Sequence, residues 1–204
     1  MSILVDHQAR KREIIVKSIR LFAKDGYKDV TFQKLADNCG LARTALYRYF
    51  HNKRQIFDAA IFEASLGIVV KYRQILVSDA SAATRLRRIC TVALTALFEN
   101  REFLSVIVDF VLGMERAGHD MSRPIHAHTI GLRRLIHPFV TEAIRRGEFL
   151  PSVDPDRATQ VLYSQFEATV LRLTITHNAD LDAVTGAIGA IIGRLAAPAA
   201  GASK

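Results

Sequence analysis

The sequence predicts an all-α protein of about nine helices, and three observations carry this prediction. Hydrophobic residues make up 50% of the 204 residues, so the chain can build a sizeable core. They recur at intervals of three and four, whereas the alternation typical of a half-buried strand is scarce. Gly and Pro number only 11 and 5, which argues against disorder or a fibrous repeat.

The first four helices are predicted by residues that cap helices or allow tight turns. Gly26 lies just past the first helix, where a left-handed residue is favoured. Thr31 is a good N-cap for the second helix, and Gly40 allows a tight turn before the third. Asn52 can cap the fourth, with Gln55 placed as in a capping box. The expected ranges are 6–24, 32–38, 42–50 and 53–77.

Five further helices are expected after a small, polar break at residues 78–84. Pro124 suits a first helical turn and Gly147 a helix end, with a kink or break expected at Pro138. Asp154 and Asp180 are N-cap residues for the last two helices. The expected ranges are 82–99, 101–117, 124–146, 155–177 and 181–196.

The charge is unevenly distributed along the chain. The formal net charge is +8, of which residues 1–55 contribute +7 and residues 56–204 contribute +1. A basic module attached to a near-neutral body suggests nucleic acid or an anionic membrane surface as partner. The most apolar stretch, residues 183–193, is too short to span a bilayer, so we expect no membrane insertion.

Two cysteines, Cys39 and Cys90, stand far apart without metal-type spacing. A reduced cytoplasmic protein is the simplest interpretation. The first residues, MSILVDHQARKRE, contain no long apolar segment before the charges, so no signal peptide is expected. We expect no cofactor.

Residues 31–50 have the proportions of a helix-turn-helix, two short helices joined by a glycine turn. Ala36 falls where the two helices would cross closely, and Gly40 follows at the turn. Arginine can contact guanine, a methyl group can touch thymine, and Tyr, Thr and Lys suit phosphates. Residues expected to pack inward are Leu35, Leu41, Leu46 and Phe50. Residues expected outside are Gln33, Arg43, Thr44, Ala45, Tyr47, Arg48 and Tyr49.

A plainer interpretation is that the aromatic residues are core and that Arg43 and Arg48 form a solvated face. The excess of positive charge and the ordered motif favour DNA binding. Phe50 is assigned to the core in either case, and Tyr49 is left open between the two. Lys53 lies at the start of the fourth helix, where the helix dipole already favours an anion.

Residues 10–62 resemble the N-terminal domain of the TetR family of transcriptional repressors, over the run LFAKDGYKDVTFQKLADNCGLARTALYRYFHNKRQIF. One departure is Ala42, where the family usually has Ser or Thr; a lost cap costs about 1 kcal/mol. The residues that carry the resemblance are Phe22, Gly26, Tyr27, Thr31, Leu35, Ala36, Gly40, Leu41, Leu46, Tyr47, Phe50, Lys53 and Phe57. By this resemblance, bases would be contacted by Gln33, Arg43, Thr44 and Ala45. Phosphates would be held by Thr31, Tyr47, Tyr49 and Lys53, with Arg48 on the same DNA-binding surface.

The resemblance implies a division into a helix-turn-helix domain (1–54), a ligand-binding and dimerisation domain (55–197) and a flexible tail (198–204). In the family the last two helices form a four-helix bundle with a second subunit. A seam of apolar residues at intervals of three and four in 181–195 fits this arrangement, although such a stripe could also bury within its own domain. The expected dimer interface contains Val161, Gln165, Thr169, Val184, Ile188, Ile191 and Leu195.

The family uses the middle helices as a ligand pocket, which would be lined here by Phe98, Phe110, Met114, His128 and Phe166. A stripe of Met and Phe is also typical of plain core. His119, Asp120, His126 and His128 cluster in sequence, but His126 and His128 diverge on a helix, so we expect no metal site. No nucleophile–base pair or phosphate loop has supporting context, so we expect no enzyme.

These observations predict a ligand-responsive repressor that binds a near-palindromic DNA operator as a homodimer and is released by a small-molecule effector. It would lie in the cytoplasm, associated with the nucleoid. A divalent-metal-responsive DNA-binding sensor and a ligand-binding module without a DNA role remain the alternatives.

Overall fold

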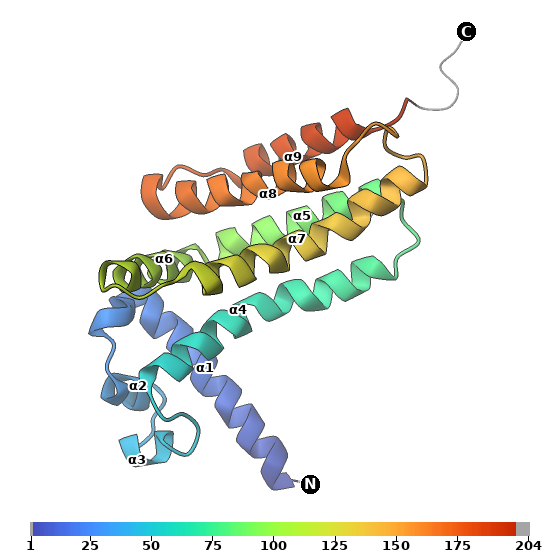
Figure 1. The fold of residues 1–204 in the computed structure, drawn as a ribbon. Helices are drawn as coiled ribbons and strands as arrows, with labels where there is room; N and C mark the ends of the chain where they lie inside the picture. The colour runs from blue at the N-terminus through green and yellow to red at the C-terminus, as the bar shows by residue number, and fades with distance from the viewer. Residues whose placement is uncertain (1, 199–204) are drawn as a thin grey trace. The chain divides into compact units, whose positions relative to one another are not determined.

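A computed structural model describes the backbone of residues 2–198 and the side chains of residues 7–122 and 131–198. Within that range the chain forms nine α-helices and one π-helical turn, which confirms the predicted all-α class (Figure 1). The bounds are α1 Ser2–Asp29, α2 Phe32–Asn38, α3 Arg43–Leu46, α4 Lys53–Leu76, α5 Ala82–Glu99, α6 Arg101–Arg116, α7 Ser122–Arg145, α8 Pro155–Leu171, the π-turn Arg172–Thr176 and α9 Leu181–Leu195. The predicted tail, beyond Pro198, lies outside the described residues.

Local signals in the sequence place most helix ends. Thr31 caps α2 by accepting a hydrogen bond from the Lys34 amide, and Asp180 caps α9 in the same way through the Asp182 amide. Asn52 accepts from the amide of Gln55, whose side chain in turn accepts from the amide of His51 rather than from that of Asn52. The capping box is thus present in a slightly shifted form.

Three elements differ from the prediction. α7 continues through Pro138, so of the expected kink or break the break is absent, although proline removes one amide from the helix ladder. α8 passes into a π-helical turn that ends at His177, whose φ of 50° is left-handed. α3 is regular only over Arg43–Leu46, shorter than the expected 42–50.

The described chain divides into two compact units. Unit 1 comprises Met1–Gly67 and Asn100–Gly118, and unit 2 comprises Ile68–Glu99 and His119–Lys204. Unit 1 therefore includes α6, which is distant in sequence from α1, α2 and α3 and packs against α1. The predicted boundary between residues 54 and 55 separates a DNA-binding domain from a ligand-binding domain, and this division by function stays a prediction.

The core of unit 1 is rich in aromatic side chains. Phe57 of α4 is fully buried, with its ring centroid 5.0 Å from that of Phe22 and 4.7 Å from that of Tyr27. Two rings of α6 complete the cluster, because Phe103 and Phe110 lie 5.7 and 5.1 Å from Phe57. Edge-to-face and tilted pairs at such distances are favourable, so these contacts hold α1, α4 and α6 together.

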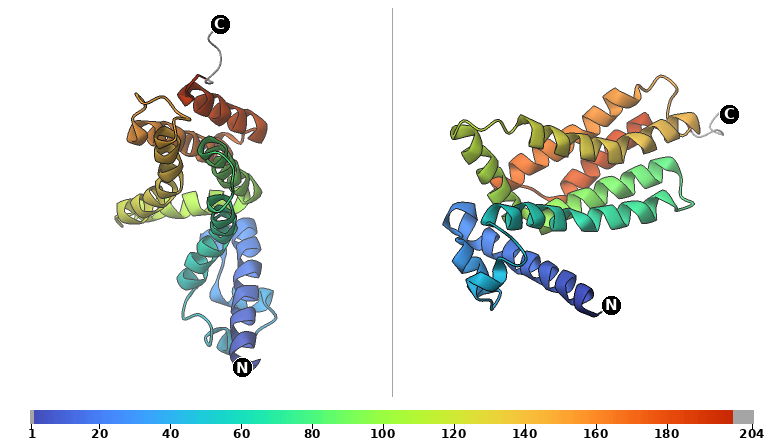
Figure 2. Two further views of the ribbon diagram at one scale, coloured as in Figure 1. Left: turned by 90° about the vertical axis from the view of Figure 1, so that its right-hand side faces the viewer. Right: turned by 60° about the horizontal axis from the view of Figure 1, so that its bottom comes forward.

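Unit 2 is a helical bundle with one hydrophobic core. α5 packs against α7 and α9, and α7 packs against α8. α8 and α9 run side by side in opposite directions (Figures 1 and 2). The largest fully buried side chains of this core are Leu86, Ile89, Leu94, Ile136, Phe139 and Phe149.

Charged residues also connect elements of unit 2. Arg85 is 6% exposed and donates to Glu142 at 2.7 Å and to the carbonyl of Leu76 at 3.3 Å. This hydrogen bond from Arg85 lowers the pKa of Glu142 below its usual value. Glu148 accepts from the amides of Ala82 and Ala83 at 3.0 and 2.8 Å, so its carboxylate caps the start of α5.

Candidate nucleic-acid interface

The turn between α2 and α3 sets the direction of α3. Gly40 has a φ of +66°, a left-handed value that glycine adopts at little cost. The Gly40 amide donates to the carbonyl of Asp37 at 3.0 Å, and the Leu41 amide donates to that of Ala36 at 2.9 Å. These two bonds form a Schellman motif, which ends α2 and redirects the chain. The turn predicted from Gly40 is confirmed.

α3 is a short helix that continues as tighter turns. Ala42 provides no side-chain cap, as its identity predicts. After Leu46, the Arg48 and Tyr49 amides bond to the carbonyls three residues before them. This 3₁₀-like geometry explains why the regular helix is shorter than expected. Leu46 is fully buried and Phe50 is 3% exposed, so both ends of this segment are anchored in unit 1.

The opposite side of this segment faces solvent. Arg43, Thr44 and Arg48 are exposed, and Ala45 is half-buried. The Tyr47 side chain is 43% exposed, with its ring 4.7 Å from that of Phe32 and its hydroxyl 3.5 Å from Arg43 Nη2. The expected separation into an inward apolar side and an outward polar side is confirmed for the residues above, whereas Leu41, expected inside, and Tyr49, expected outside, are both half-buried.

The start of α2 lies next to this surface, since α2 and α3 pack together. Thr31 and Gln33 are both exposed. Thr31 Oγ1 already accepts from the Lys34 amide, so its own hydroxyl proton remains able to donate to a phosphate. Gln33 Nε2 donates to Asp37 Oδ1 at 2.7 Å, which leaves the amide oxygen of Gln33 as its free acceptor.

The N-terminal part of α1 contributes residues that the sequence interpretation did not assign to the interface. The His7 ring stacks on Tyr49 with centroids 4.7 Å apart, and Lys11 Nζ lies 5.2 Å from the Phe50 ring. Arg10 donates to the Cys39 carbonyl at 3.2 Å and so fastens α1 to the turn. The basic run ARKR at residues 9–12 was the available signal, but it does not show which ring each cation would meet.

Lys53 bonds to the backbone at the end of α1, a role that its place at the start of α4 does not predict. Its ammonium donates to the carbonyls of Tyr27 and Lys28 at 2.8 and 3.3 Å and lies 4.4 Å from the Tyr27 ring. Partial burial lowers the pKa of Lys53, and the Asp29 carboxylate partly opposes this effect. Two of its three donors therefore fasten the end of α1 to the start of α4. Its predicted phosphate contact would use the third.

The predicted ligand-lining residues are distributed over both units. Phe110 packs against Tyr27 and Phe57 in unit 1, and Met114 is half-buried on the same helix, α6. Phe166 is 2% exposed in the core of unit 2, and Phe98 is half-buried on α5. The side chain of His128 lies outside the described residues. The pocket composed of these five stays a prediction.

The predicted dimer-interface residues fall into two groups. Thr169, Val184 and Ile188 are 1%, 4% and 1% exposed, so their side chains already pack inside unit 2. Val161 is 49% exposed, whereas Gln165, Ile191 and Leu195 are half-buried. The interface stays a prediction, and its accessible candidates lie on the outer sides of α8 and α9.

The described side chains and helices also bear on two other kinds of site, a metal centre and a membrane span. Among those side chains, no three His, Cys, Asp or Glu residues converge in a way that could hold a metal ion. Among the helices so described, none is both long and apolar enough to cross a membrane.

Comparison with known proteins identifies the domain that carries this surface. Residues 14–60 match the model of the bacterial regulatory proteins of the tetR family. The N-terminal domain is a TetR-family domain. The resemblance predicted from the sequence is thereby confirmed, and the matched residues include the α2–α3 turn and the outward side of α3.

A curated relative, the nucleoid occlusion factor SlmA of Salmonella paratyphi B, is 35% identical over 81 residues. The match covers 39% of this chain and 41% of SlmA, so the chain spans about two fifths of the length of the curated relatives it matches. The likeness to SlmA therefore does not extend over the whole of either protein.

Solved structures resemble this chain along nearly its full length. A TetR transcription regulator from Haloarcula marismortui has a TM-score of 0.79 at 19% identity, covering 93% of this chain and all of the other. The regulator FadR of Bacillus subtilis, solved in complex with stearoyl-CoA, has a TM-score of 0.70 at 21% identity, covering 89% and 96%. At such identities the likeness shows the fold.

Proposed function

We propose that the chain is a ligand-responsive transcriptional repressor that binds a near-palindromic operator as a homodimer in the bacterial cytoplasm. The observation that carries the proposal is the outward side of α3. Arg43, Thr44 and Arg48 stand exposed on a segment whose other side is anchored by Leu46 and Phe50. A rigid, cationic helix of this kind suits the major groove, and the match to the TetR family supports this use.

The residues around α3 take different roles in this proposal. Arg43, Thr44, Ala45 and Gln33 face the bases, where a guanidinium can pair with guanine and methyl groups can contact thymine. The phosphate backbone is held by hydroxyl and cationic groups that flank α3. This second set is Thr31, Tyr47, Arg48, Tyr49 and Lys53, with His7 supporting the ring of Tyr49.

A second subunit is part of the proposal, because one short helix reads too few base pairs for specific binding. The two α3 segments of a homodimer would bind half-sites whose centres lie about 34–36 Å apart. Apolar side chains at the surface of α8 and its π-turn support such an interface: Val161, Leu171 and Ile175 are 49%, 54% and 59% exposed. On α9, the exposed Gly186, Ala187 and Ala190 would permit close approach of another helix.

The effector is proposed to act through unit 2. FadR, which has the same fold, was solved in complex with stearoyl-CoA, and this supports a small-molecule ligand for this chain without identifying it. An effector can release DNA only if it binds one arrangement of the dimer more tightly than the other. The proposal requires that its affinity differ between the DNA-bound and free states.

Replacement of Arg43 by alanine tests the DNA-binding part. A cognate site is first selected from random duplexes, and binding is then followed by fluorescence anisotropy at several salt concentrations. Arg43→Ala should weaken cognate binding by about 1–3 kcal/mol per contacted base pair and relax the preference there, with a smaller effect on random DNA. The matched control is Arg87→Ala, which removes an exposed arginine from α5 of unit 2.

The affinities for cognate and random DNA distinguish two outcomes. If cognate and random DNA lose affinity equally, Arg43 contacts phosphate and does not read bases. If the wild-type chain binds no selected duplex above its affinity for random DNA, the chain is better described as a ligand-binding module without a DNA role.

A further inference from the structure

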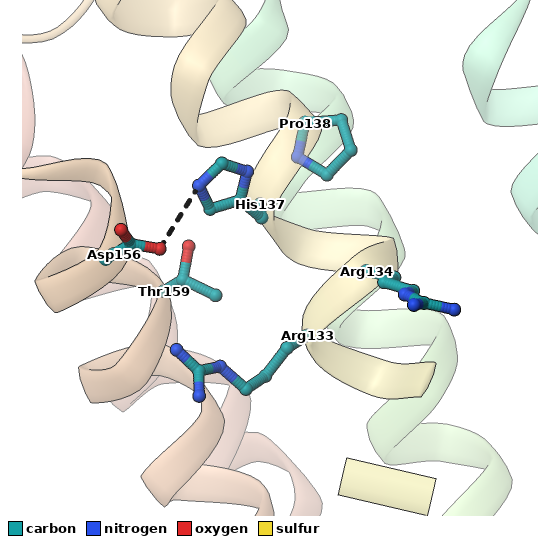
Figure 3. Close-up of a pocket in the computed structure, with 6 residues that line it drawn as sticks. All are labelled: Arg133, Arg134, His137, Pro138, Asp156 and Thr159. Atoms are coloured by element: carbon teal, nitrogen blue, oxygen red, sulfur yellow. Dashed lines mark ion pairs between the residues drawn. The ribbon is translucent and has the colours of Figure 1, made fainter. Parts of the chain in front are cut away.

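A surface pocket of about 390 Å³ lies between α7 and α8 in unit 2. Figure 3 shows its walls: Arg133, Arg134, His137 and Pro138 come from α7, and Asp156 and Thr159 come from α8. None of these residues belongs to the predicted ligand pocket or to the DNA surface. Its volume falls in the range of small-molecule sites.

A buried hydroxyl without a partner is the first sign of a missing ligand. Thr159 is 1% exposed, and its Oγ1 has no hydrogen-bond partner among the described residues. Figure 3 shows this hydroxyl directed into the space between His137 and Asp156. A buried polar group left unpaired is unfavourable, so an acceptor or donor entering the pocket would be stabilised there.

The charges of the walls favour a negative ligand. Arg133 lines the pocket and reaches from α7 toward α8 (Figure 3). Asp156 is the carboxylate of the walls, and its Oδ1 lies 3.4 Å from His137 Nε2, so it is directed toward the imidazole. Figure 3 shows the Arg134 side chain directed away from Thr159 and Asp156, so the guanidinium that can meet a ligand between the helices is that of Arg133, while Asp156 is already directed at His137.

We propose that this pocket binds the anionic end, a carboxylate or a phosphate, of a small organic molecule. Arg133 would form a charge-assisted, bidentate pair with the anion, and the Thr159 hydroxyl would donate to it. Pro138 and the aliphatic parts of the arginines would contact the apolar remainder. The proposal rests on the proposed function only in that such a molecule would serve as the effector; the binding itself does not require DNA.

Isothermal titration calorimetry on the full chain tests this site with three probes that share one alkyl chain: octanoate, octyl phosphate and octanol. We expect octanoate or octyl phosphate to bind and octanol to bind at least about tenfold more weakly. The anion with the higher affinity identifies the headgroup. Arg133→Gln should weaken that anion by about tenfold or more, and Thr159→Val by a few-fold. Asp156→Asn, which removes the opposing charge, should strengthen it.

The control is Arg87→Gln, which removes one exposed positive charge from α5 of the same unit and should leave the affinity unchanged. Urea unfolding of each variant shows whether it is folded. If Thr159→Val, which changes a buried residue, does not fold, Arg133→Gln still tests the proposal. The proposal is overturned if neither anion binds, if octanol binds as well as the anions, or if Arg133→Gln keeps the wild-type affinity. Because no step uses DNA, failure here leaves the DNA-binding proposal standing.

Discussion

Lys53 has two possible roles, a brace within unit 1 and a phosphate contact, and replacing it with methionine separates them. Methionine keeps the length of the apolar stem but removes the ammonium and its bonds to Tyr27 and Lys28. The bond of 2.8 Å has good geometry and that of 3.3 Å is weaker. With the cation–π contact to Tyr27, offset by the cost of partial burial, we expect a loss of about 1–2 kcal/mol in unfolding free energy.

Urea unfolding followed by circular dichroism measures the brace, and the salt dependence of DNA binding measures the phosphate contact. A lost phosphate contact should reduce the slope of log affinity against log salt by about 0.9 per subunit. Lys24→Met is the matched control, because it removes an exposed lysine of α1. If Lys53→Met unfolds at the same urea concentration as the wild type and Lys24→Met, the bonding pattern of Lys53 does not stabilise the fold and the reasoning is wrong.

Three other variants test separate contacts. His7→Ala removes the ring that stacks on Tyr49, and we expect DNA affinity measured by anisotropy to fall about two- to tenfold; unchanged affinity would show that the stack does not support the interface. Ala187→Glu places a charge on the exposed side of α9 and should give monomers by light scattering, whereas a persistent dimer would place the interface elsewhere. The hydrogen bond from Arg85 lowers the pKa of Glu142 from its usual value of 4.5. Glu142 therefore stabilises the fold above pH 4.5, and this stabilisation is lost as the pH falls through the lower folded-state pKa. Glu142→Gln should remove this part of the acid dependence of the unfolding free energy in urea, and an unaltered pH profile would contradict the prediction.

The sequence predicts best what depends on near neighbours. Thr31, Asn52 and Asp180 cap helices because each side chain reaches amides two or three residues ahead. Gly40 adopts a positive φ at a turn that needs one. Leu46 and Phe50 are buried as the helical spacing indicates. For these residues, chemistry and spacing along the chain determine the structure.

Contacts between distant residues were harder to foresee. The stack of His7 on Tyr49 and the bond of Lys53 to Tyr27 join positions that no local pattern relates. The seam of α9 predicts an interface with a second subunit, and Val184 and Ile188 of this seam lie within the core of unit 2. Periodicity shows that a stripe is buried without showing which surface covers it, so an apolar seam alone cannot separate core from interface.

The membership of α6 in unit 1 has a consequence for anyone who isolates the TetR-family domain. Phe103 and Phe110 complete the aromatic cluster around Phe57, although about 40 residues of sequence separate them from the end of the first segment of the unit, Gly67. A fragment cut after that segment would expose the Phe57 ring to water and be less stable than the same residues in the full chain. During synthesis the same cluster cannot close until Phe110 has left the ribosome, so unit 1 cannot finish folding while only its first segment, up to Gly67, has emerged.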